Sequence, residues 1–154
     1  MDKREFQGNL DAKGKQFALI VSRFNELLSK QLLGGALDCL ERHGAKMADV
    51  FWVAGAYEIP AIARRLAASN RYDGVIAVGA VIHGDTPHAE YINIEVAKGL
   101  SKVYYDTGVP ATFGVITADM LEQALERAGG KVGNKGWSAA LAAIEMVNLE
   151  ACVQ

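Results

Sequence analysis

Four short, almost continuously apolar runs are the feature that most constrains the fold of this chain. They cover residues 17–22 (FALIVS), 50–54 (VFWVA), 74–82 (GVIAVGAVI) and 111–116 (ATFGVI). Strands that are buried on both faces have this composition, whereas strands with one wet face alternate apolar and polar residues. The runs therefore predict the buried strands of a parallel sheet.

Helical patterns separate these runs. In residues 25–43, apolar positions 28, 32, 36, 39 and 40 form one stripe, and Gly44 follows as a stop signal. Further helices are expected over 58–69 (with Pro60 in its first turn), from Thr86–Pro87 onward, over 119–128, and from 134 to about 150 with Trp137, Leu141, Ile144 and Leu149 toward a core. Because strands and helices alternate, we predict right-handed βαβ units. The expected fold is a three-layer α/β/α sandwich with a mostly parallel, four-stranded, flavodoxin-like sheet, formed by residues 1–154 as a single domain.

The N-terminal arm, residues 1–15, fits no βαβ unit. Its β-like stretch is expected to pair with a sheet edge, either in its own subunit or in a neighbouring one. The arm carries too many charges for a signal peptide, and no run approaches the roughly 20 apolar residues of a membrane span. These features indicate a cytoplasmic protein without a membrane partner.

The net charge and the cysteine content limit the kinds of function that this protein can have. A net charge of -2 argues against a basic face for nucleic acid. Cys39 and Cys152 each lie in a helical pattern among apolar neighbours. We expect both to be buried, reduced thiols rather than a disulfide or a nucleophile.

The carboxyl ends of the four runs carry the candidate chemistry, because ligands of open parallel sheets bind there. Phe24 follows the first run, Tyr57 and Glu58 follow the second, and Phe113 lies within the fourth. The third run ends in HGDTPH, residues 83–88. Aromatic rings, a carboxylate and a histidine at one edge would suit a flat polar heterocycle.

The stretch HGDTPH has more than one reading. Thr86 and Pro87 favour a helix start capped by Thr86, and the amides of 84–86 could then hold a phosphate. His88 would lie in the first turn, neutral and able to transfer protons. The alternatives are a capped turn without a ligand, a structural or surface His88, and a zinc site made of His83, Asp85 and His88. The zinc reading is disfavoured because these side chains straddle a strand end and a helix start.

A second cluster of cations, Arg127, Lys131 and Lys135, surrounds AGGKVGNKG. Cations at a helix end complement its dipole, which is one explanation. A mobile arm that binds phosphate is the other.

Six motifs, in order along the chain, resemble the lumazine synthase (6,7-dimethyl-8-ribityllumazine synthase) family. They are SRFN (22–25), GAYEIP (55–60), GDTPHAEY (84–91), PATFGVIT (110–117), QALERAG (123–129) and GNKGWSAALAAIEMVNL (133–149). The resemblance implies condensation of 5-amino-6-(D-ribitylamino)uracil with 3,4-dihydroxy-2-butanone 4-phosphate in riboflavin biosynthesis. The products would be the lumazine, phosphate and water, and no metal or other cofactor is implied. A generic flavodoxin-like nucleotide binder would share the fold but not these ordered motifs.

The resemblance also implies a role for each matching residue. His88 would be the catalytic proton-transfer residue, and Asp85 and Thr86 would cradle the phosphate with Arg127 of an adjacent subunit. The ribitylaminouracil would be bound by Phe24, Ala56, Tyr57, Glu58, Ala80, Val81, Ile82, Phe113 from a neighbouring subunit, and Lys135.

Family members form pentamers with active sites at subunit interfaces, and many assemble pentamers into an icosahedral shell. The short GGKVGNKG turn resembles the shell-forming members, and riboflavin synthase is a candidate partner. The chain departs from the family pattern at Ala54 (usually Pro), His83 (usually Arg), Asp85 (commonly a small residue) and Ser138 (usually acidic). These departures keep an alternative open, namely a weakly active or inactive member that forms shells or binds flavin.

Overall fold

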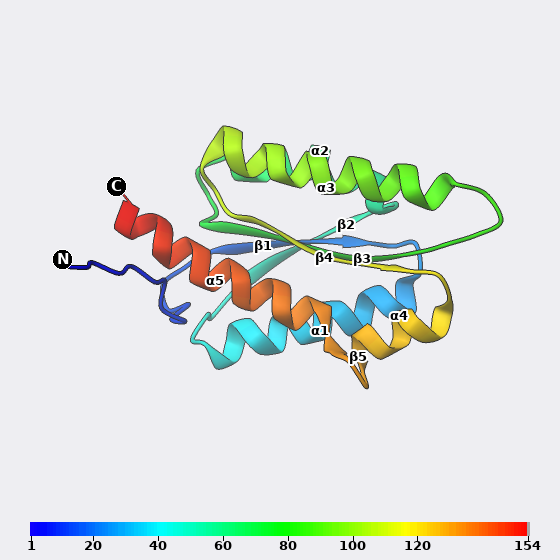
Figure 1. The fold of residues 1–154 in the computed structure, drawn as a ribbon, viewed down its shortest axis with the longest axis horizontal. Helices are drawn as coiled ribbons and strands as arrows, with labels where there is room; N and C mark the ends of the chain where they lie inside the picture. Colours follow the sequence, from blue (N-terminus) through cyan, green and yellow to red (C-terminus); the bar gives the residue numbers. More distant parts are fainter. Residues whose placement is uncertain (154) are drawn as a thin grey trace.

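The structure is a computed structural model that describes residues 1–153. Four parallel strands form one sheet in the order β2-β1-β3-β4, with β1 over Phe17–Ser22, β2 over Ala48–Val53, β3 over Gly74–Ile82 and β4 over Ala111–Ala118. The connecting elements are α1 (Glu26–Arg42), the 3-10 helix η1 (Ala56–Glu58), α2 (Ile59–Ala67), α3 (His88–Thr107), α4 (Leu121–Arg127), the hairpin strands β5 (Ala128–Gly130) and β6 (Gly133–Asn134), and α5 (Lys135–Val153). In Figure 1, α2 and α3 cover one face of the sheet, and α1, α4 and α5 cover the other. The predicted three-layer α/β/α sandwich is confirmed.

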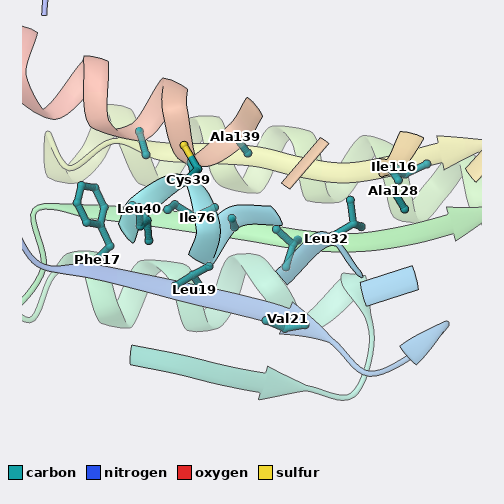
Figure 2. Close-up of a cluster of buried hydrophobic side chains, with 14 of the residues drawn as sticks. Phe17, Leu19, Val21, Leu32, Cys39, Leu40, Ile76, Ile116, Ala128 and Ala139 are labelled. Carbon is teal, nitrogen blue, oxygen red and sulfur yellow. The ribbon is translucent and has the colours of Figure 1, made fainter. Parts of the chain in front are cut away.

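Both faces of the central strands are buried, which explains their unbroken apolar sequence. Leu19 and Val21 of β1 point into the core under α1 and α5, whereas Ile20 points into the core under α2 and α3. Figure 2 shows the first of these cores, with Leu32, Cys39 and Leu40 of α1 packed above β1 and β3. The edge strand β2 is only partly buried for most of its length, because it has a neighbour on one side alone.

Helix α1 buries all five residues of its predicted stripe, together with Ser29. It ends at Arg42, and Gly44 follows with a φ of 98°, the left-handed conformation that glycine adopts at little cost. Pro60 lies in the first turn of α2, as predicted. In α5 the buried residues are mostly small, and Trp137, Leu141 and Leu149 are only half-buried.

Two local predictions were wrong. Helix α3 begins at His88 with Pro87 at the N-cap position, so Thr86 lies one residue outside and makes no capping hydrogen bond. A proline at the N-cap supplies no side-chain acceptor, which leaves the first amides of α3 unpaired. Cys152 is exposed rather than buried, because the last turn of α5 (151–153) lies at the surface, whereas Cys39 is fully buried; both thiols are free.

The N-terminal arm is attached to the helices rather than to the sheet of its own chain. Ala12 is fully buried and its N–H donates to His43 O at 2.8 Å, while Asn148 Nδ2 donates to Asn9 O and Asp11 O at 2.9 Å each. Residues 1–16 form no strand. The expected pairing with the chain's own sheet edge is therefore not found, and pairing with a neighbouring subunit stays a prediction. No helix within residues 1–153 combines the length and apolarity needed to cross a membrane.

Candidate functional site

A cleft of about 680 Å³ opens at the carboxyl ends of β1 and β3, between η1 and the start of α3. It lies where a doubly wound sheet is expected to bind ligands. Its lining comprises Ser22, Phe24, Ala54, Gly55, Ala56, Tyr57, Glu58, Ala80, Val81, Ile82, Gly84, Thr86, His88, Ala89 and Ile92. Most of the predicted site residues therefore meet in one cavity.

The aromatic part of this cleft is unusually exposed. Phe24 is 71% exposed and Tyr57 is 65% exposed, although both border an apolar cavity. The backbone holds Phe24 in place, because Arg23 N–H donates to Val53 O at 2.8 Å and Phe24 N–H donates to Ala54 O at 3.2 Å. Rings left open to solvent beside a cavity are available to stack on a ligand.

Small residues let the strand ends approach one another under the cleft. A Cβ on Gly79 would lie 2.9 Å from Ser22 Cβ, closer than real Cβ atoms come. Gly55 plays a similar part in the η1 turn, where Glu58 N–H donates to Gly55 O at 3.2 Å and a Cβ on Gly55 would lie 3.2 Å from Glu58 Oε2. The floor of the cleft is thus set by residues without bulk.

The loop after β3 contributes Gly84, Thr86 and His88 to the cleft, and Figure 1 shows it projecting beyond the sheet. Among residues 1–153, no protein group accepts a hydrogen bond from the N–H of Gly84, Asp85 or Thr86. These donors stand at the amino end of α3, whose dipole is positive there. Free amides at such a terminus form an arrangement that suits an anion. Asp85 is exposed and does not line the cleft.

The surroundings of His83 do not resemble a metal site. The backbone N–H of His83 donates to Ala118 O at 2.8 Å, and its side-chain Nε2 lies 3.7 Å from Glu90 Oε1. In the part of the chain that the structure describes, no three His, Cys, Asp or Glu side chains gather closely enough to hold a metal ion. The set of His83, Asp85 and His88 is therefore not assembled.

A second cleft, of about 450 Å³, runs along the free edge of β4 beside the β5–β6 hairpin. Its lining includes Phe113, Arg127, Lys135 and Ser138. Arg127 Nη1 donates to Gln123 O at 2.9 Å, so the guanidinium also satisfies a carbonyl at the end of α4. Lys131 is exposed and does not line either cleft. Within one chain, the predicted site residues are therefore divided between two cavities.

Sequence reasoning missed several lining residues. Ala89 and Ile92 form part of the first cleft, and Val132 and Asn134 form part of the second. Such residues give no side-chain pattern that points to a ligand. Only their position, near the start of α3 or in the hairpin after α4, could have identified them.

The fold and the first cleft define an α/β protein with an apolar cleft at its strand ends, bordered by exposed aromatic rings. The sequence profile of the 6,7-dimethyl-8-ribityllumazine synthase family matches residues 14–151 of the 154-residue chain. The chain therefore belongs to the lumazine synthase family, the transferases of riboflavin biosynthesis.

Proposed function

We propose that this protein is an active lumazine synthase, which condenses 5-amino-6-(D-ribitylamino)uracil with 3,4-dihydroxy-2-butanone 4-phosphate. The observation that carries the proposal is the first cleft. One cavity joins an exposed ring, a carboxylate, a histidine and, at its border, free amides at a helix start. The family match supports reading this combination as the site of the lumazine synthase reaction.

The proposed uracil site lies between Phe24 and the end of β3. The Phe24 ring would stack on the flat pyrimidine, and the backbone of Ala80–Ile82 would hydrogen-bond its edge. The η1 turn, Ala56–Glu58, would hold the polyol chain, since Glu58 supplies acceptors for its hydroxyl groups.

The proposed phosphate site is the amino end of α3. The free amides of residues 84–86 would receive the anion, with the Thr86 hydroxyl as a further donor and Asp85 providing a backbone N–H. The exposed carboxylate of Asp85 opposes this arrangement electrostatically, so the amides and an added cation must outweigh it. Arg127 of another copy would supply that cation.

His88, the first residue of α3, would move the protons. The amine of the uracil attacks the butanone carbonyl, and loss of water gives an imine. Removal of a carbon-bound proton then expels inorganic phosphate. This elimination leaves an enol, which takes up a proton at its terminal carbon and becomes a ketone. The ribityl-bearing nitrogen attacks that new ketone, and a second loss of water closes the ring. Each step transfers a proton, and general acid–base catalysis typically contributes about 10²–10⁴-fold.

We further propose that the second cleft of one subunit completes the first cleft of its neighbour, in a pentamer. Phe113 would cover the bound ring, Arg127 would meet the phosphate, and Lys135 would lie nearby. Exposed apolar side chains on and beside α4 support an interface there, namely Met120, Leu121, Leu125 and Val132. A closed icosahedral shell and association with riboflavin synthase are proposals of the same kind. Light scattering that shows only monomers would contradict all of them.

Mixed assemblies offer a sharper test of shared sites. His88→Ala alters the first cleft and Arg127→Ala the second, so each variant alone should be weakly active. After joint unfolding and refolding, some neighbouring pairs would combine an intact first cleft with an intact second cleft. Activity should then exceed that of either refolded variant, whereas sites contained within single chains would give no gain.

A second candidate function is a weakly active shell or flavin-binding member of the family. His83, Asp85 and Ser138 favour it, because each departs from the family pattern beside one of the clefts. The two readings are separated by incubating the protein with both substrates and following the absorbance and fluorescence of the lumazine. No product at high protein concentration would refute the enzyme, and quenching of riboflavin fluorescence would then support the alternative.

A further inference from the structure

Asn25 adopts a backbone conformation that most residues avoid. Its φ is 59° and its ψ is 49°, in the left-handed region. Within residues 1–153, Asn70 is the one other non-glycine residue with a positive φ. Asparagine tolerates this region better than residues with bulkier side chains, so its occurrence at a turn between β1 and α1 has a physical reason.

The side chain of Asn25 is not used to cap α1. Asn25 occupies the N-cap position, where asparagine commonly accepts a hydrogen bond from the first turn, yet it makes no side-chain capping bond. Helix α1 begins instead through Asn25 O, which accepts from Ser29 N–H at 3.1 Å. The side-chain amide is therefore free for another partner.

That partner is the end of β3. Asn25 Nδ2 donates to Ala80 O at 2.9 Å, across 55 positions of sequence. The register of β1 with β3 ends at the Val21–Val78 pair, so the Ala80 carbonyl lies beyond the last backbone pairing between these strands. The Asn25 amide extends the connection past the point where β1 has turned away.

The two residues that this hydrogen bond joins flank the first cleft. Phe24 precedes Asn25 and lines the cleft, Ala80 lines it from β3, and Asn25 itself is half-buried and does not line it. Phe24 and Ala80 are thus fixed relative to each other by a group behind the wall of the cavity.

We propose that Asn25 is a positioning residue for ring binding: it holds the stacking ring of Phe24 at the correct distance from the β3 edge. This inference rests on the proposed function, since it assumes that the pyrimidine lies between these two elements. Asn25 would make no contact with the substrate. Its loss should weaken binding of the uracil substrate and leave the phosphate site at the start of α3 unchanged.

Two substitutions separate the hydrogen bond from the backbone conformation. Asn25→Asp retains the shape and the tolerance for positive φ but replaces the donor with an acceptor that repels Ala80 O. Asn25→Gly retains the backbone conformation and removes the side chain. Asn70→Asp and Asn70→Gly are matched controls, because Asn70 has a φ of 58° and lies exposed between α2 and β3, away from both clefts.

The measurements are KM for each substrate, kcat, and equilibrium dialysis of 5-amino-6-(D-ribitylamino)uracil alone, with circular dichroism to verify folding. Both Asn25 variants should raise KM and Kd for the uracil by about tenfold or more, because a displaced stacking ring loses its alignment. KM for the butanone phosphate should change by less than about twofold, and both Asn70 variants should match wild type in every reading.

The outcomes separate this inference from the proposed function. Wild-type turnover with an unchanged uracil KM in both Asn25 variants overturns the positioning role and leaves the enzyme intact. Equal losses for both substrates in folded Asn25 variants also overturn it. A wild-type protein that binds the uracil without turnover, and loses that binding in both variants, supports the positioning role and refutes the enzyme. A wild-type protein that binds no uracil refutes both.

Discussion

Gly136 of α5 lies against the backbone of Leu32 in α1, and Gly136→Ala tests how these helices are held together. A Cβ at this position would lie 2.0 Å from Leu32 O and 2.7 Å from Leu32 C. Real Cβ atoms essentially never approach closer than 3.0 Å. Because the obstacle is backbone, no side-chain rotation can relieve the overlap, and α5 must move by at least about 1 Å.

The energetic consequence follows from that displacement. A gap of about 0.5–1 Å forfeits a quarter to a half of each dispersion contact across an interface. The affected interface packs Ala139, Ala140 and Ile144 of α5 into the same core as Leu32 of α1. Overpacked cores lose about 1–3 kcal/mol, and the rigid backbone clash places Gly136→Ala near the upper end, at about 3 kcal/mol.

Urea unfolding followed by circular dichroism measures this loss, at one protein concentration because assembly affects stability. With a slope of about 2 kcal/mol/M, the midpoint should fall by about 1.5 M. Gly34→Ala is the matched control, since Gly34 lies in α1 with nothing within 4 Å of its would-be Cβ. Alanine in an open helix position adds about 0.5–1 kcal/mol, so that midpoint should rise. A Gly136→Ala midpoint equal to wild type would refute the reasoning.

Four further predictions concern the site and the thiols. His88→Ala should lower kcat by about 10²-fold or more without a change in melting temperature, and an unchanged kcat would exclude His88 from the chemistry. Arg127→Ala should raise KM for the butanone phosphate, with partial recovery in Arg127→Lys; equal KM values would contradict its assignment. His83→Arg should lower that KM, because a permanent cation would stand beside the free amides of 84–86, whereas a raised or unchanged KM would count against a phosphate site there. Burial, aided by the Asp38 carboxylate, raises the pKa of the Cys39 thiol from 9.0 to about 11. Cys39 therefore stays protonated and stabilising up to pH 9 and loses this contribution as the pH rises through 11. At pH 9, mass spectrometry should find iodoacetamide on exposed Cys152 and not on Cys39, and equal labelling would show that Cys39 is accessible.

The fold could be predicted because the hydrophobic pattern reports burial directly. The runs at 17–22 and 74–82 coincide with β1 and β3, the two strands with a neighbour on each side. The run at 50–54 is displaced from β2 (Ala48–Val53), where partial burial allows Asp49 inside the strand. The sequence predicted a start of α3 that is too early, because Thr-Pro is compatible with more than one cap geometry. In the structure Pro87 occupies the N-cap position.

The site could be predicted only in part, because the end of a strand fixes the position of a residue but not the groups that its side chain faces. Position alone brought Phe24, Tyr57, Glu58 and His88 to one edge, and they meet in one cleft. The hydrogen bond from Asn25 to Ala80 O could not be predicted, since it depends on a left-handed turn and on the length of β1. The pairing of His83 with Glu90 was equally hidden, because it joins a strand end to a helix turn across the loop.

The sheet register explains why one chain is not expected to complete the site by itself. Phe113 pairs with Ala77, whereas the cleft begins at Ala80 and extends past Ile82, which pairs with Ala118. At about 3.3 Å per residue, Phe113 stands about 16 Å back along β4 from the level of Ile82. No rotamer spans that distance within a rigid parallel sheet, so the proposed cover of the bound substrate by Phe113 requires a different copy of the chain. Under the proposed shared site, assembly is a condition for catalysis, and dilution to monomers should abolish turnover while leaving the fold of each chain intact.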